Sequence, residues 1–286
     1  MATTSFNWNA GAHTARRHLA TTGRAMHQSI RQLSSGLRVQ TASDDAANMA
    51  ISVTSRASIA SNEMAARNAE DAMALLKTTD GAIQSIQDTV IRMRELAVQG
   101  ATDALNKSAR KGLNQEYQTH LDEIDRIFRS TEFNGIQLLD GAVGQDYNPA
   151  GRIFQVGPSA ASSSKMKIDL DFSSVFNLIQ VESGAGINDL KTVKNSQTRI
   201  KFLDAIAQSV QTERVRVGSM TNRLQFATDN LMTGIENEKS SLSTRVDTDI
   251  ASASAEFTKN QVLMQAGISM LSQANAAPQM LLRLLG

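Results

Sequence analysis

Apolar residues return every three or four positions through most of residues 189–277, a stretch without proline. The first part of this seam consists of Leu203, Ile206, Val210, Val217, Met220, Leu224, Ala227 and Leu231. The pattern slips between Glu238 and Val246, and it resumes as Val246, Ile250, Ala253, Phe257, Met264, Ile268 and Leu271. A heptad pattern of this length predicts one very long helix that packs on other helices. Roughly 85 helical residues would extend on the order of 130 Å, so the rest of the chain must supply its partners.

Three further helices are predicted in the first half of the chain. The first covers residues 10–36 and has a thin apolar stripe, so we expect it to be stable only against a partner. The second covers residues 44–100, with Ser43 as its N-cap and two aspartates in its first turn. The third ends near Ser130, and the Phe133-Asn134-Gly135 sequence that follows signals a turn.

The centre of the chain, residues 136–190, has a different pattern. Glycines and two of the three prolines, Pro149 and Pro158, interrupt it. Residues 153–156 and 166–172 are short β-prone runs, and the second of them alternates between apolar and polar positions. We therefore predict a mainly α fold: a long antiparallel helical bundle or coiled coil with a small β-hairpin region at its distal tip, and with the two chain ends meeting at the other end.

Composition narrows the class of protein. The chain has 286 residues, 41% hydrophobic and 20% charged, which indicates neither a disordered nor a membrane protein. A net charge of +1 gives no reason to expect nucleic acid as a partner. The absence of cysteine excludes disulfides, thiolate metal sites and cysteine nucleophiles. No apolar run is long enough for a secretory signal or for membrane insertion, so we expect any export to use no cleaved hydrophobic leader.

Enzymatic chemistry finds no support in the side-chain pattern. His13, His18 and His27 are five and nine residues apart, a spacing that does not place a pair on one helix face. The adjacent aspartates at 44 and 45 are explained by helix capping, and the acidic cluster at residues 122–125 by a solvated helix face. We therefore expect no catalytic residues, no bound cofactor and no metal.

Several ordered motifs resemble bacterial flagellin. In the first half they are LSSGLR at residues 33–38, DDAA at 44–47, TDGA at 79–82, MRELAVQ at 93–99, LDEIDR at 121–126 and FNG at 133–135. Residues 154–157 and 167–170 are similar to the hairpin segment of that family, and residues 265–285 to its C-terminus. Residues 6–9 match the family's start, but residues 10–14 depart from it and weaken the apolar seam of the first helix.

The resemblance implies two domains. Residues 1–43 and 246–286 would form a terminal coiled-coil domain at the filament core. Residues 44–245 would form a helical bundle domain with the β-hairpin region at about 136–190. Too few residues separate the third helix from the returning helix to hold the outer variable domains of larger flagellins, so a short form is expected.

The function implied by the resemblance is structural. Copies of the chain would polymerise into the extracellular flagellar filament for swimming motility, after export through the flagellar type III apparatus with a chaperone. Hook-associated and cap proteins would be further partners. Two alternatives remain open: a hook–filament junction protein, and a flagellin-like cell-surface protein that binds polysaccharide or a receptor.

Two sets of residues are candidates for contact. The expected polymerisation interface is Phe6, Asn7, Leu19, Ile30, Leu33, Phe257, Met264, Ile268, Leu271, Leu281 and Leu284. A second set lies where some flagellins are recognised by a Toll-like innate receptor: Arg92, Leu96, Gln99 and Glu116. The same region is also explained by packing between neighbouring subunits.

The thin terminal helices suggest that folding and assembly are coupled. Alone, they cannot bury enough surface to offset the entropy of ordering, whereas neighbours in a helical array would supply the missing contacts. We therefore expect residues 1–40 and 246–286 to be mobile in the monomer and to become ordered on polymerisation. The slip in the seam before Val246 marks the expected change of role along the long helix.

Overall fold

The computed structural model describes residues 9–139, 152–168, 172, 175, 179 and 189–285, and for residues 277–285 it describes the backbone alone. Five long helices dominate the described chain: α1 (Ala10–Ser35), α2 (Ala46–Gly100), α3 (Lys107–Ser130), α5 (Val193–Val246) and α6 (Ile250–Leu285). Two compact units divide it: unit 1 consists of Met1–Ile59 and Glu236–Gly286, and unit 2 of Ala60–Ile235. The mainly α prediction is confirmed.

The prediction of one uninterrupted C-terminal helix is wrong, because α5 ends at Val246 and α6 begins at Ile250. Residues 246–248 bond instead to the segment that follows α1. The carbonyl oxygen of Val246 accepts from Arg38 N at 2.7 Å, and Thr248 N donates to the Gly36 carbonyl oxygen at 2.8 Å. Asp249 then caps the new helix, because its Oδ1 accepts from the backbone nitrogens of residues 251 and 252 at 2.9 and 3.2 Å.

The connection between α1 and α2 is built from local caps. Gly36 ends α1 in the left-handed conformation with φ 72°, which costs a glycine little, and its amide bonds to Gln32 O. The predicted N-cap of α2, Ser43, does not cap it. Asp45 does so, since its Oδ1 accepts from Asn48 N at 2.9 Å. This bond is the main cause that lowers the pKa of Asp45.

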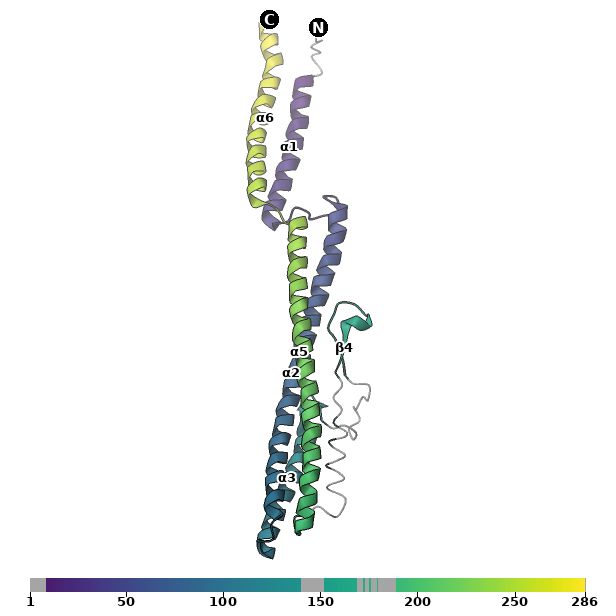
Figure 1. Cartoon of the computed structure of the whole chain (residues 1–286). Coiled ribbons are helices and arrows are strands. Elements are labelled where there is room, and N and C mark those ends of the chain that lie inside the picture. Colours follow the sequence, from purple (N-terminus) through teal and green to yellow (C-terminus); the bar gives the residue numbers. More distant parts are fainter. Residues whose placement is uncertain are drawn as a thin grey trace. The chain divides into compact units, whose positions relative to one another are not determined.

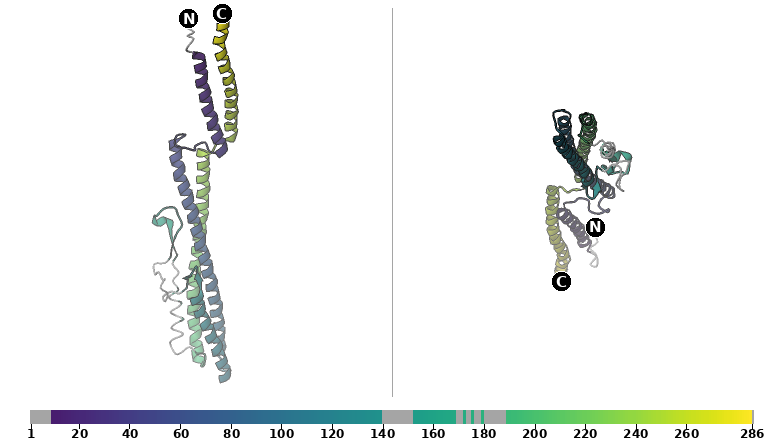
Figure 2. Two further views of the ribbon diagram at one scale, coloured as in Figure 1. Left: turned by 180° about the vertical axis from the view of Figure 1, so that it is seen from behind. Right: turned by 90° about the horizontal axis from the view of Figure 1, so that it is seen from below.

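Unit 1 contains a pair of helices, α1 and α6, which run antiparallel and side by side (Figures 1 and 2). The start of α1 therefore lies beside the end of α6. Asn9 Nδ2 donates to the carbonyl oxygen of Ala274 at 2.8 Å, which ties these two ends together.

Unit 2 is a bundle of α2, α3 and α5 around one apolar core (Figure 1). The largest fully buried side chains of the described chain are Tyr117, Phe128, Leu76, Ile83, Ile86, Met93, Leu96, Ile124, Leu139, Ile168, Leu190 and Leu203, all of them in this unit. Two ion pairs join α2 to α5 across its surface: Arg94 with Asp204 at 2.6 Å, and Arg214 with Asp80 at 3.1 Å. Their side chains are about half exposed, so they contribute little to stability.

Tyr117, at the centre of this core, makes the stability of the fold sensitive to alkaline pH. Burial raises the pKa of its phenol to about 12. In the unfolded chain the tyrosine phenol ionises near about pH 10. The stability that the buried, neutral Tyr117 gives to the fold is therefore fully present below pH 10 and is lost as pH rises from 10 to 12. We expect the unfolding free energy to fall by roughly 2–3 kcal/mol over this range. In Tyr117→Phe the unfolding free energy, measured by urea denaturation, should fall less steeply between pH 10 and 12. An equally steep fall in this variant would show that Tyr117 is not the responsible group.

The small strands form two antiparallel hairpins. In the first, β1 (Glu132–Phe133) pairs with β2 (Ile136–Gln137), and Asn134 and Gly135 connect them with φ values of 52° and 75°. Two positive values are the mark of a type I′ turn, which the Asn-Gly sequence favours. In the second, β3 (Arg152–Gln155) pairs with β4 (Lys165–Ile168) through the 3₁₀ turn η1 (Ser162–Ser164). The predicted central hairpin is thus confirmed.

Its predicted place at the tip of the bundle is wrong. The end of unit 2 is formed by the turn after α2 and the start of α5, where Gly100 lies against Ser196 and Leu190. The β3–β4 hairpin lies beside the opposite part of α2 in this unit, because Asn68 Nδ2 donates to the Gln155 carbonyl oxygen at 3.1 Å. Met166 and Ile168 are buried in the bundle core, and at the tip they would face water instead.

Candidate functional site

The α1–α6 pair of unit 1 has a regular heptad seam. On α1 the seam positions are Ala12, Ala15, Leu19, Thr22, Met26, Ser29 and Leu33, and on α6 they are Ala253, Phe257, Asn260, Met264, Gly267, Leu271 and Ala274. All of these side chains are buried or half-buried. The spacing alternates between three and four residues on both helices, as in a coiled coil.

Large residues of one helix pack against small residues of the other. A Cβ atom placed on Gly267 would lie 2.7 Å from Leu19 Cδ1, and one placed on Gly23 would lie 3.3 Å from Met264 Cε. These contacts and the bond from Asn9 to Ala274 fix the same register. The seam therefore specifies the pairing of α1 with α6 by shape.

Two polar residues lie inside this seam. Ser29 is 5% exposed and donates to the Ala25 carbonyl oxygen. Asn260 is 7% exposed, and its Nδ2 has no hydrogen-bond partner within the described chain. A buried donor without a partner costs about 1–3 kcal/mol. Together with the small layers, it lowers the stability that the seam gives to the α1–α6 pair.

The surface of α6 outside the seam is also apolar. Val262 is 59% exposed, Leu263 47%, Ile268 55% and Met270 64%. At 100° per residue, Ile268 lies on one flank of the seam, Leu263 and Met270 lie on the other, and Val262 lies opposite the seam. Large apolar side chains exposed on several sides of one helix are normally covered by neighbours. We define these four side chains as the outer face of α6.

The predicted interface residues divide between the seam and the surface. Leu19, Leu33, Phe257, Met264 and Leu271 are half-buried in the seam, whereas Ile30 and Ile268 are 42% and 55% exposed. The predicted seam through Ile268 is wrong at that position, because Gly267 packs on Leu19 and turns Ile268 outward. Phe6 and Asn7 lie outside the described residues. Leu281 and Leu284 lie in α6, in the part for which only the backbone is described.

The second predicted set is only partly at the surface. Arg92 pairs with Glu95 at 2.9 Å and with Glu116 at 2.8 Å, and Gln99 is exposed. Leu96 is 1% exposed and belongs to the core of unit 2. Its place in the predicted contact surface is therefore corrected: it packs inward together with Met93 and Ala97, whereas Arg92 and Glu95 in the same turns of α2 are exposed.

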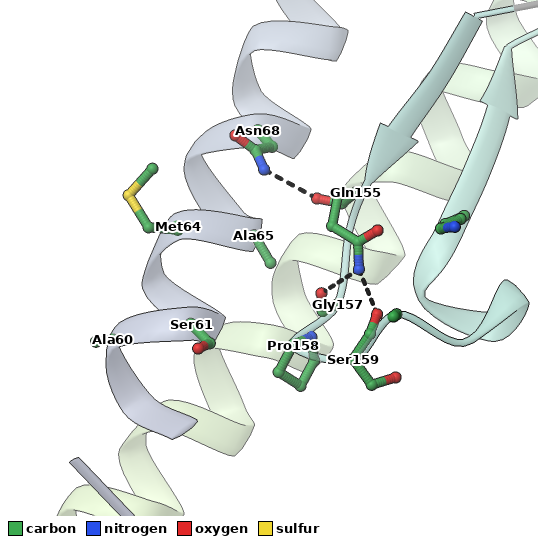
Figure 3. Close-up of a pocket in the computed structure, with 11 residues that line it drawn as sticks. Ala60, Ser61, Met64, Ala65, Asn68, Gln155, Gly157, Pro158 and Ser159 are labelled. Atoms are coloured by element: carbon green, nitrogen blue, oxygen red, sulfur yellow. Dashed lines mark hydrogen bonds between the residues drawn. The ribbon is translucent and has the colours of Figure 1, made fainter. Parts of the chain in front are cut away.

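A groove in unit 2 lies between α2 and the loop of the β3–β4 hairpin (Figure 3). It has a volume of about 620 Å³, and Ala60, Met64, Ala65 and Pro158 contribute its apolar lining. Gln155 Nε2 donates to the carbonyl oxygens of Gly157 and Ser159, which folds the loop beside the helix. Because the Gln155 amide donates to its own loop, it holds the loop that forms one wall of the groove.

The described residues offer neither a metal cluster nor a membrane-spanning helix. They contain no group of three or more histidine, cysteine, aspartate or glutamate side chains that could hold a metal ion. None of their helices combines the length and apolarity needed to cross a membrane.

Taken together, the described part of the chain defines a helical structural subunit whose two end helices pair through a seam of large and small residues and leave apolar side chains of α6 exposed. The chain matches the bacterial flagellin N-terminal helical region over residues 6–143 and the bacterial flagellin C-terminal helical region over residues 200–285. It belongs to the bacterial flagellin family.

Relatives extend the match over nearly the whole chain. Flagellin of Halalkalibacterium halodurans is 36% identical over 279 residues, which is 98% of each chain. Flagellin of Bacillus subtilis is 33% identical over 300 residues, covering 98% of this chain and 99% of the relative. The crystal structure of Bacillus cereus flagellin, 35% identical, covers 58% of this chain and 88% of its own with a TM-score of 0.48.

Proposed function

We propose that this chain is the structural subunit of an extracellular bacterial flagellar filament and that it polymerises through the exposed faces of α1 and α6. The outer face of α6 is the observation that carries the proposal. Exposed apolar side chains on several sides of one helix need several neighbours. A head-to-tail contact that does not close into a ring generates the open helical polymer that such an array requires.

The proposed interface combines predicted and newly found residues. Ile30 and Ile268 keep the role that the sequence suggested, and the exposed Val262, Leu263 and Met270 join them. The predicted residues that lie in the seam have an indirect role in assembly. They hold α1 and α6 together, and the paired helices then present the outer face to other copies. The proposed division of roles, with residues 1–43 and 246–286 at the filament core and 44–245 in the surrounding bundle, rests on the resemblance to the family.

Further partners follow from family membership. We propose export through the flagellar apparatus with a chaperone, and contact with hook-associated and cap proteins at the filament ends. The role is mechanical, with no catalytic step, no cofactor, no nucleic acid and no membrane insertion. The exposed Arg92 and Gln99 and the half-buried Glu116 remain candidates for a Toll-like receptor or for a neighbouring subunit.

Electron microscopy of the purified chain after salt-induced assembly tests this proposal directly. We expect long filaments of uniform width. A chain that stays monomeric under all assembly conditions, or that only binds surface glycans, would overturn the proposal.

The shape of the seam gives a more specific prediction. Gly267→Val should push Leu19 out of its place and cost the α1–α6 pair about 1–3 kcal/mol by overpacking. Assembled filaments of this variant should dissociate at a lower temperature than the wild type, measured by light scattering. Gly218→Val is the matched control, because a Cβ on Gly218 would meet nothing within 4 Å. Equal dissociation temperatures for the two variants would contradict the proposed register.

A further inference from the structure

Three arginines form a straight row on the outward side of α1. Arg17, Arg24 and Arg31 follow one another at intervals of seven residues, so their Cα atoms are about 10.5 Å apart along the helix. All three side chains are exposed and lie opposite the seam with α6. With Arg16 they give α1 four positive charges, and no aspartate or glutamate occurs between Ala10 and Ser35.

Little within the described chain compensates this charge. None of the three arginines forms an ion pair there, and Arg17 Nη2 reaches only the hydroxyl of Thr14, at 3.5 Å. Arg31 lies within electrostatic reach of one carboxylate. The pKa of Asp44 is lowered mainly by hydrogen bonds from Thr41, and the charge of Arg31 adds a smaller effect.

The two units differ in their balance of charges. Unit 1 contains ten lysines and arginines against seven aspartates and glutamates, and the four arginines of α1 account for the excess. Unit 2 contains nineteen basic residues against twenty-one acidic ones, and sixteen of these acidic residues lie in its described part. Exposed carboxylates such as Glu70, Asp71 and Asp122 in unit 2 form no ion pair among the described residues. The chain as a whole is close to neutral.

We propose that the arginine row of α1 docks on acidic side chains of unit 2 in a neighbouring copy of this chain. The inference rests on the proposed function, and it names the charged part of the polymer contact. In an array of parallel copies, uncompensated rows would repel one another, since charges within about 10 Å interact at moderate salt. Carboxylates of a second copy remove this repulsion and fix the stagger between subunits, as electrostatic complementarity does at other interfaces.

A polyanion is the less favoured occupant of the row. It would bring an excess of negative charge that the nearly neutral chain does not need. The exposed carboxylates of unit 2, such as Glu70, Asp71 and Asp122, can supply the matching charge within the homopolymer.

The test compares critical concentrations for assembly at about 10 mM and about 0.1 M salt, where the Debye length is about 30 and 10 Å. The variant is Arg17→Gln, Arg24→Gln and Arg31→Gln together. The control, Lys107→Gln, Lys111→Gln and Lys201→Gln together, removes the same charge from exposed positions of unit 2. We expect the arginine variant to need about fivefold more protein at the lower salt, with a smaller difference at the higher salt.

Further arms separate the possible outcomes. The triple Arg→Lys variant keeps the charge and should assemble like the wild type, and circular dichroism checks that helix content is unchanged. An arginine variant that assembles as well as the control, or better, overturns the inference. The inference is also overturned if the arginine row makes the wild-type protein bind to phosphocellulose while the arginine variant assembles normally. If neither the wild type nor the control assembles, the proposed function itself fails.

Discussion

Ile268→Asp should abolish assembly while the core of unit 2 unfolds as in the wild type. Ile268 is 55% exposed on one flank of α6, so the substitution removes no contact of that core. In a polymer the aspartate would have to be buried between subunits without a partner, which costs several kcal/mol. We expect the critical concentration to rise by more than about 100-fold. Sedimentation measures assembly, and urea denaturation followed by circular dichroism measures the fold.

Gln261→Asp is the matched control for this prediction. It lies one heptad before Ile268, on the same flank of α6, and it introduces the same charge in place of an exposed polar side chain. This variant should assemble at a concentration much closer to that of the wild type. Normal filaments from Ile268→Asp would show that this flank of α6 is not an interface.

Leu224→Ala should destabilise the subunit itself. Leu224 is fully buried in the core of unit 2. Truncation of a buried leucine costs about 2–5 kcal/mol, through lost apolar contact and the cavity that remains. The midpoint of urea denaturation of the monomer should therefore shift to a clearly lower concentration, with an unchanged slope.

Leu263→Ala provides the opposite pattern. Leu263 is 47% exposed on the outer face of α6, so the monomer should denature almost as the wild type does. Its effect should be seen in assembly instead. If both leucine variants changed the same property by the same amount, the distinction between core and interface would fail.

Periodicity in the sequence predicted most of the fold. The bounds of α1 and α3 and the pairing of β3 with β4 followed from apolar spacing and turn residues. The break between α5 and α6 could not be predicted in this way, because residues 247–249 are compatible with a helix. It depends on hydrogen bonds that the Gly36 carbonyl oxygen accepts from Thr248 and that Arg38 N donates to Val246, and these partners lie more than 200 positions apart in the chain.

The candidate site was harder to predict, for a related reason. The spacing of apolar residues shows which of them share a face. On α6, however, exposed apolar residues occur on both flanks and on the side opposite the seam, so spacing alone cannot decide which face turns inward. That choice depends on Leu19, which fits over Gly267 and leaves Ile268 outside. Leu96 was misplaced because the resemblance marked its neighbourhood as a surface, whereas the heptad of Met93, Leu96 and Ala97 marks the core.

Amide hydrogen exchange of the monomer and of assembled filaments tests the central claim most directly. The claim is that α1 and α6 are weakly held in the free subunit and gain their missing contacts from other copies. We therefore predict rapid exchange in both helices of the monomer, slow exchange in the core of unit 2, and strong protection of α1 and α6 after assembly. Strong protection of α1 and α6 in isolated subunits, or unchanged exchange there in filaments, would contradict the account.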